Sequence, residues 1–232
     1  MEDKFIIFDF DGVLADSINI CCEEVNILRE SLFPQLPAVF DQEGMALLYS
    51  GILRTSLRRF GLTDEQSRLF FDLHSQAMER RVTSIQLFDE VVEIFFAIPE
   101  NRRAIVTSAY SFAVQSALKK YRSVHRFQQI LILGREMQKP KSKKFEMICS
   151  LHNIPKDSII TVGDTASDIL YAQEFGVSVC AVGWGYHPME YLHKFKPDFT
   201  ARSPDDLRKI LGIPIKFPYS HFQTVKESYH DY

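Results

Sequence analysis

Short apolar runs recur along the chain, separated by segments with the length and period of helices. Five runs are too short for a helix and rich in β-branched residues, which favours buried strands. These runs are Phe5–Phe10, Arg103–Thr107, Ile130–Leu133, Ile159–Gly163 and Val177–Val182. Helical patterns occupy Ser111–Tyr121, Lys143–His152 and Ala166–Phe175 between them. Strands that alternate with helices predict an α/β protein built on a parallel sheet.

One long interval breaks this alternation. Residues 18–81 contain helical patterns, such as Glu65–Arg81, and no convincing strand. We therefore expect an all-helical domain at 18–81, inserted into a core made of residues 1–17 and 82–212. The aromatic and polar tail at 213–232 has no role that its sequence indicates.

Composition narrows the classes of function. The chain has 232 residues, 46% of them hydrophobic and 25% charged, which is typical of a folded globular protein. Its net charge of -3 gives no general attraction for nucleic acid or an anionic membrane. Four scattered cysteines, and the lack of a signal peptide or long apolar run, lead us to expect a cytoplasmic protein. The oligomeric state is not indicated.

Polar side chains follow four of the predicted strands or lie shortly after them. The set comprises Asp9, Asp11, Thr107, Ser108, Lys139, Asp164 and Asp168. Because ligands bind beyond the carboxyl ends of the strands in open parallel sheets, we expect these side chains to meet at one edge. Taken singly, each aspartate could instead belong to a turn or a helix cap.

Several carboxylates at one edge would repel one another unless a cation lay between them. Ligands that are all oxygen favour Mg²⁺ over zinc. The seven histidines show no metal-ligand spacing that would compete for zinc. The sequence therefore predicts a magnesium site.

The order of these motifs resembles the haloacid dehalogenase superfamily. The run DFDGVLADS at Asp9–Ser17 resembles the first motif, and Thr107, Lys139-Pro140 and the run GDTASD at Gly163–Asp168 resemble the other three. The resemblance covers roughly residues 4 to 211. It implies a Rossmann-like core, with a helical cap domain between the first and second motifs.

The resemblance also implies a role for each site residue. Asp9 would be the nucleophile, and Asp11 would protonate the leaving oxygen and then activate water. Asp9, the backbone carbonyl of Asp11 and Asp164 would hold Mg²⁺, with Asp168 acting on these ligands from behind or simply capping a helix. Two further roles complete the site: Thr107 and the Ser108 amide would bind phosphoryl oxygens, and Lys139 would offset negative charge.

The second carboxylate, Asp11, favours phosphoryl transfer over dehalogenation. The resemblance therefore implies a Mg²⁺-dependent phosphatase of a small organic phosphate monoester, such as phosphoglycolate or a sugar phosphate. In the cap, Arg54 resembles a substrate-binding arginine of sugar-phosphate mutases, although it could equally be a solvated helix charge. A hexose-phosphate mutase stays open as an alternative, and so does a non-catalytic binding or regulatory module on the same fold.

Overall fold

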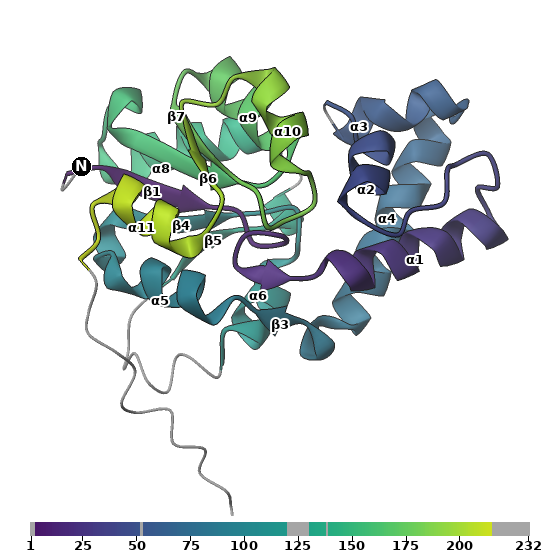
Figure 1. Cartoon of the computed structure of the whole chain (residues 1–232), viewed down its shortest axis with the longest axis horizontal. Helices are drawn as coiled ribbons and strands as arrows, with labels where there is room; N and C mark the ends of the chain where they lie inside the picture. The colour runs from purple at the N-terminus through teal and green to yellow at the C-terminus, as the bar shows by residue number, and fades with distance from the viewer. Residues whose placement is uncertain (1–2, 52, 120–129, 138, 215–232) are drawn as a thin grey trace, which may run out of the picture.

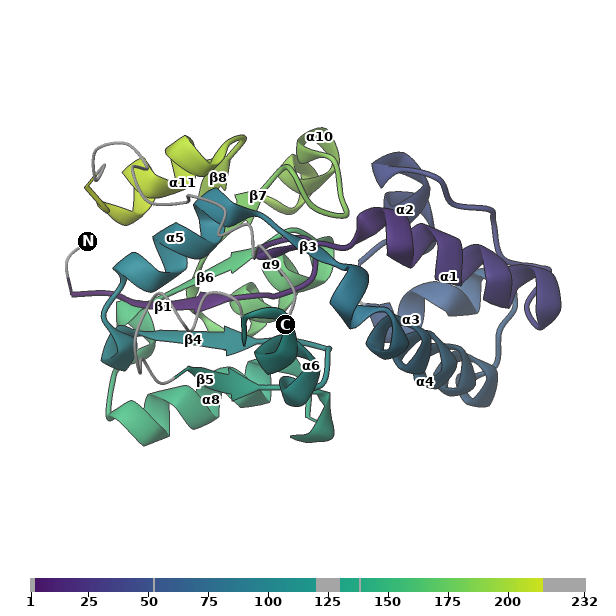
Figure 2. The same cartoon turned by 90° about the horizontal axis from the view of Figure 1, so that it is seen from below.

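The computed structural model describes residues 3–51, 53–119, 130–137 and 139–214, except for the side chains of Leu53 and Arg54. Two lobes lie side by side in both views (Figures 1 and 2). One lobe contains the sheet and its flanking helices, and the other contains the helices of residues 18–81. Of the predicted tail, residues 215–232 lie outside the described part of the chain. Within that part, no helix has the length and apolar character needed to cross a membrane.

The main sheet has six parallel strands in the order β5-β4-β1-β6-β7-β8. In that order the strands are Leu131–Leu133, Arg103–Val106, Phe5–Phe8, Ile159–Gly163, Ser178–Val182 and Phe199–Ala201. The parallel α/β class is confirmed, and each predicted apolar run forms a strand within two residues of the expected bounds. The strand β8 was not predicted, because Phe199-Thr200-Ala201 is a short segment at the edge of the sheet.

Both faces of the sheet are covered by helices. In β1, Ile6 and Phe8 face a buried cluster that includes residues of α5 (Asp89–Ala97) and α11 (Pro204–Leu211). Phe5 and Ile7 face a second cluster with α8, α9 and α10. Those three helices span Lys141–His152, Ala166–Phe175 and Met189–Leu192. Burial on both faces explains why the strands read as continuous apolar runs instead of alternating ones.

The helical insertion, residues 18–81, has an apolar core of its own. Its helices are α1 (Ile18–Ser31), α2 (Gln42–Leu48), α3 (Leu53–Ser56) and α4 (Asp64–Arg80). Thr63 and Gln66 form a reciprocal capping box that fixes the start of α4. Val25, Met45 and Phe70 belong to the buried cluster between these helices. No strand occurs among the described residues of this segment.

Two short strands connect the lobes. The segment β2 (Ala15–Asp16) leads into α1, and β3 (Gln86–Leu87) returns the chain to the sheet lobe as its antiparallel partner. Polar contacts also join the lobes. The Gln42 amide donates to the Gly185 carbonyl at 2.7 Å, the Ser167 hydroxyl donates to the Gly51 carbonyl at 2.8 Å, and Arg135 pairs with Asp72. The insertion is thereby seated over the carboxyl ends of the strands.

Candidate active site

The carboxyl ends of β1, β4 and β6 meet at one edge of the sheet. Asp9 follows β1, Thr107 follows β4 and Asp164 follows β6, so strand order brings together residues that are far apart in sequence. A cleft of about 890 Å³ opens over Asp9 and Thr107 and is also lined by side chains of the insertion. The site therefore lies where the topology of a parallel sheet predicts it.

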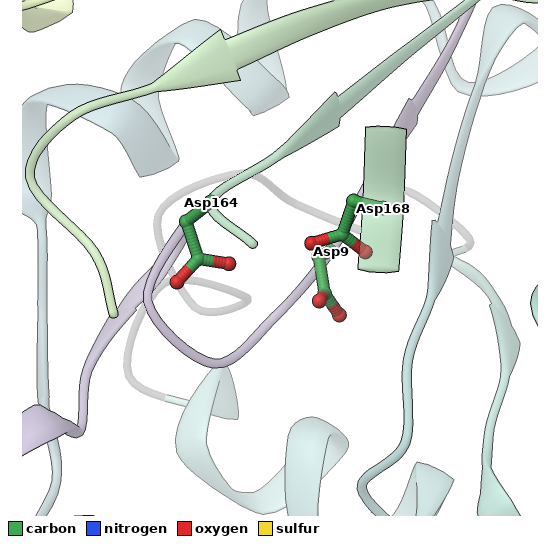
Figure 3. A group of neighbouring side chains, drawn as sticks. All are labelled: Asp9, Asp164 and Asp168. Carbon is green, nitrogen blue, oxygen red and sulfur yellow. The ribbon is translucent and has the colours of Figure 1, made fainter. Parts of the chain in front are cut away.

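Three carboxylates converge in this site (Figure 3). One oxygen from each of Asp9, Asp164 and Asp168 lies within 4.8 Å of the others. Asp164 is completely buried, and Asp168 is nearly so. Such a group is costly to ionise unless cations balance it.

A lysine supplies part of that balance. The Lys141 ammonium lies 2.5 Å from Asp9 Oδ2 and 2.5 Å from Asp168 Oδ1, and its side chain is only 11% exposed. The structure places Lys141, and not the predicted Lys139, against these carboxylates. Lys139 is exposed and lines the cleft, whereas Lys141 begins α8 directly after Pro140 and points at the carboxylates.

Burial and neighbouring charges shift the pKa values of these groups in different directions. Burial raises the pKa of Asp9 to about 6, although Lys141 opposes the rise. Burial, together with the nearby Asp168 and Asp9 charges, raises the pKa of Asp164 well above its usual range. Burial would also raise the pKa of Asp168, but the Lys141 charge and hydrogen bonds from Lys141 and Thr165 outweigh it and lower the value. Despite its burial, the Lys141 pKa is raised by Asp168 and Asp9.

Both carboxylate oxygens of Asp168 accept hydrogen bonds from neighbouring side chains or backbone. Its Oδ2 accepts hydrogen bonds from the Thr165 amide at 3.0 Å and the Thr165 hydroxyl at 2.6 Å, and its Oδ1 accepts from Lys141. With Thr165 it forms the capping box of α9. Asp168 therefore caps α9 and contacts Lys141 at the same time.

Asp11 lies on a tight loop after β1. The Gly12 amide donates to the Ala15 carbonyl at 2.8 Å, and Gly12 has a φ of 75°. A Cβ at Gly12 would overlap the Asp164 carboxylate, so both conformation and space require glycine here. The Asp11 carboxyl accepts a hydrogen bond from the Ser17 hydroxyl at 2.9 Å. Burial raises the Asp11 pKa, which the Ser17 hydrogen bond opposes.

Thr107 and Ser108 lie at the end of β4. Thr107 is buried, and its hydroxyl accepts a hydrogen bond from the Ala109 amide at 3.0 Å. Ser108 lines the cleft. The buried Lys144 ammonium donates to the carbonyls of Thr107 at 2.7 Å and Gly134 at 2.8 Å, tying together the ends of β4 and β5. Sequence reasoning did not single out Lys144.

Arg54, the predicted substrate-binding residue of the insertion, lies in α3, but its side chain is outside the described part of the chain. Described side chains of the insertion that do line the cleft include Arg58, Arg68 and His74. Burial lowers the pKa of His74 to about 4, so this ring is neutral at pH 7.

The donor atoms fit a hard divalent cation. Asp164 Oδ1 is buried without a hydrogen-bond partner among the described residues. The groups that converge near this oxygen are the carboxylates of Asp9 and Asp168. Among the described residues, one ammonium, that of Lys141, hydrogen bonds to both of them. An oxygen-only set with an excess of negative charge is the environment that Mg²⁺ prefers.

Comparison with known proteins agrees with this geometry. The family model described as haloacid dehalogenase-like hydrolase matches residues 6–182. A pyrophosphatase PpaX from Halalkalibacterium halodurans is 24% identical over 217 residues, covering 92% of this chain and 99% of the relative. A phosphoglycolate phosphatase from Mannheimia succiniciproducens is 27% identical over 220 residues, covering 90% and 98%.

Solved structures share the fold. A hydrolase from Pseudomonas syringae superposes with a TM-score of 0.71 at 22% identity, covering 90% of this chain and 98% of the other. A predicted phosphoglycolate phosphatase from Haemophilus somnus gives a TM-score of 0.65 at 22% identity, covering 91% and 99%. Because the family model spans most of the sequence and includes the loops that carry Asp9, Thr107 and Asp164, the chain belongs to the haloacid dehalogenase-like hydrolase family.

Proposed function

We propose that this hydrolase is a Mg²⁺-dependent phosphatase that cleaves small organic phosphate monoesters through an aspartyl-phosphate on Asp9. The observation that carries the proposal is the pairing of two carboxyls with different surroundings. The Asp9 carboxylate accepts a hydrogen bond from the charged Lys141 ammonium, whereas the Asp11 carboxyl accepts one from the neutral Ser17 hydroxyl. Such a difference suits one carboxyl to bond formation and the other to proton transfer.

Asp9 is the nucleophile in this proposal. Its attack forms a bond between a carboxylate oxygen and phosphorus while the ester P–O bond breaks. Lys141 keeps Asp9 ionised against the effect of burial and offsets charge on the transferring group. The Phe10 amide donates to Asp9 Oδ1 at 2.8 Å and restrains the carboxylate.

Asp11 transfers the proton. As the ester bond breaks, the protonated Asp11 carboxyl gives its proton to the leaving oxygen. The resulting carboxylate then removes a proton from the water that attacks the aspartyl-phosphate, which releases phosphate and restores both groups. A pKa raised by burial favours the protonated form that the first step needs.

The side chains of Asp9 and Asp164 and the backbone carbonyl of Asp11 would hold Mg²⁺, with Asp168 orienting Lys141 from behind. When bound, the cation would neutralise negative charge on the phosphoryl oxygens. The Thr107 hydroxyl and the Ser108 amide would bind those oxygens at the other side of the site.

The helical insertion would act as the cap that closes over the substrate and excludes water. Its side chains line the same cleft as Asp9 and Asp11, which supports that role. Substrate choice would then depend on the insertion, with Arg54 as one candidate for the part of the substrate that does not react.

The relatives support a small phosphorylated substrate. One is named phosphoglycolate phosphatase. A second candidate function follows from another, named pyrophosphatase PpaX. In inorganic pyrophosphate the leaving group is itself phosphate, so the same attack by Asp9 would apply.

The test is phosphate release from 4-nitrophenyl phosphate, phosphoglycolate, a hexose phosphate and pyrophosphate, each with Mg²⁺ and with EDTA. We expect Mg²⁺-dependent turnover that Asp9→Asn abolishes, while the matched change Asp16→Asn in the nearby strand β2 leaves it intact. A preference for pyrophosphate would select the second candidate. Full activity in Asp9→Asn would refute the assigned nucleophile.

A further inference from the structure

Tyr186 touches three parts of the site that the mechanism above leaves unconnected. It lies on the loop that follows β7. Its backbone amide donates to Asp164 Oδ2 at 2.7 Å, and its hydroxyl lies 2.9 Å from Ser17 Oγ. Its side chain packs against the buried cluster of the helical insertion. One residue of the sheet lobe thus contacts a candidate metal ligand, the residue just before the insertion and the apolar core of the insertion.

The loop holds Tyr186 firmly. A Cβ on the preceding Gly185 would overlap the Asp164 carboxylate, so the backbone is pressed directly against that group. The Gln42 side chain of the insertion binds the Gly185 carbonyl at 2.7 Å. The next residue, His187, donates its amide to the Asp164 carbonyl at 3.3 Å. The position of Tyr186 therefore depends on how the insertion packs against this loop.

Ser17 is the second link. Serine is a preferred residue at the position before a helix, where its hydroxyl normally accepts a backbone amide. Ser17 stands at that position before α1, yet its side chain makes no such cap. The hydroxyl instead donates to Asp11 Oδ1 at 2.9 Å, and the residue is fully buried. In place of capping α1, the Ser17 hydroxyl therefore contacts the carboxyl that transfers the proton.

The direction of the second hydrogen bond follows from proton counting. A serine hydroxyl has one proton to donate. When that proton points at the Asp11 carboxylate, the contact between Ser17 and Tyr186 requires the tyrosine to donate. The chain therefore runs from Tyr186 through Ser17 to Asp11 Oδ1. Among the described residues nothing donates a hydrogen bond to Asp11 Oδ2, so that oxygen is the one left for the reacting atoms.

We propose that Tyr186 is a positioning residue for leaving-group protonation, acting through Ser17 on the carboxyl of Asp11. The inference rests on the proposed phosphatase function. When the ester bond breaks, the Asp11 proton passes to the leaving oxygen and Asp11 becomes a carboxylate. The hydroxyl chain then donates to the new charge, which lowers the cost of giving up the proton.

The basicity of the leaving group distinguishes this role from general support of the fold. Phenyl phosphate releases a more basic oxygen than 4-nitrophenyl phosphate, so its cleavage depends more on proton transfer. For Tyr186→Phe we expect kcat/KM to fall about tenfold on phenyl phosphate and by less than about twofold on 4-nitrophenyl phosphate. The ratio kcat/KM is the measure to use because it reports the first phosphoryl transfer.

Two sets of variants complete the test. Tyr191→Phe removes the same atom from a nearby tyrosine and should leave both esters unaffected. Ser17→Ala should reproduce the selective loss, Ser17→Thr should restore the rate, and Tyr186→Phe should add less than about twofold in the Ser17→Ala background.

Equal losses on the two esters in Tyr186→Phe, or full additivity with Ser17→Ala, would overturn the inference while leaving the phosphatase intact. Failure of the unaltered protein to hydrolyse either ester with Mg²⁺ would instead refute the proposed function, and the inference with it.

Discussion

Replacing Lys141 should remove the charge balance of the site. Its ammonium lies 2.5 Å from both Asp9 and Asp168 and is almost excluded from water. Even with this lysine present, burial holds the Asp9 pKa at about 6. Without Lys141, protonation of Asp9 is the most favourable way to remove the charge repulsion between the neighbouring carboxylates of Asp9 and Asp168. A protonated Asp9 cannot attack phosphorus.

The loss can be sized from two contributions. Removal of a preorganised cation from a buried site costs roughly 3 to 4 kcal/mol of transition-state stabilisation, or about a hundredfold to a thousandfold in kcat. Protonation of Asp9 lowers the rate further at neutral pH. Because that proton also relieves repulsion, we expect Lys141→Ala to remain folded and to lose far more activity than stability.

The matched control is Lys139→Ala, which removes the same side chain two residues earlier, at the exposed rim of the cleft. Activity on 4-nitrophenyl phosphate and the melting temperature should be measured for both variants. We expect Lys139→Ala to keep kcat within about threefold of the unaltered protein. A Lys141→Ala enzyme with nearly full kcat, or a larger loss in Lys139→Ala, would refute the charge-balance reasoning.

Three further predictions concern the metal and the backbone. Mg²⁺ should raise the melting temperature more at pH 7 than at pH 5. The pKa of Asp9 is raised from 3.8 to about 6 in the folded protein, so its ionised form dominates only above about pH 6. At pH 5 a proton on Asp9 therefore competes with the cation. Burial lowers the pKa of His187 to about 4, so acid destabilises the folded protein through this residue with or without Mg²⁺. Comparing the Mg²⁺-induced change in melting temperature at the two pH values removes that effect. A larger change at pH 5 would contradict the assigned ligands. Gly12→Ala should abolish Mg²⁺ stabilisation, since its Cβ would overlap Asp164, and a normal thermal shift would count against that geometry. Lys144→Met should lower the free energy of unfolding by about 2 to 3 kcal/mol, measured by urea denaturation, because two buried carbonyls lose a charged donor; an unchanged midpoint would show that Lys144 does not stabilise the strand ends.

Most of the fold could be predicted from local patterns in the sequence. Each central strand is buried on both faces, so its run of apolar residues was visible without knowledge of its partners. The edge strand Phe199–Ala201 was not visible, because three residues with a central threonine carry no such signal. Asp9 and Asp164 could be placed together because parallel strands end at the same edge.

Contacts that depend on the path of a loop were beyond local patterns. Two lysines flank Pro140, and only the start of α8 at the second one decides which of them reaches Asp9. Ser17 and Tyr186 are 169 residues apart, and neither residue type marks a site by itself. A serine before a helix predicts a cap, so its contact with Asp11 needed the three-dimensional structure.

In the proposed mechanism, Asp9 carries the phosphoryl group during turnover. The most direct measurement is mass spectrometry of peptides from enzyme mixed with substrate and Mg²⁺ and quenched in acid within milliseconds, with Asp11→Asn used to slow hydrolysis of the intermediate. We predict one added phosphoryl group on the peptide containing Asp9, absent in Asp9→Asn. Turnover without any phosphorylated aspartate, or with the group on another residue, would contradict it.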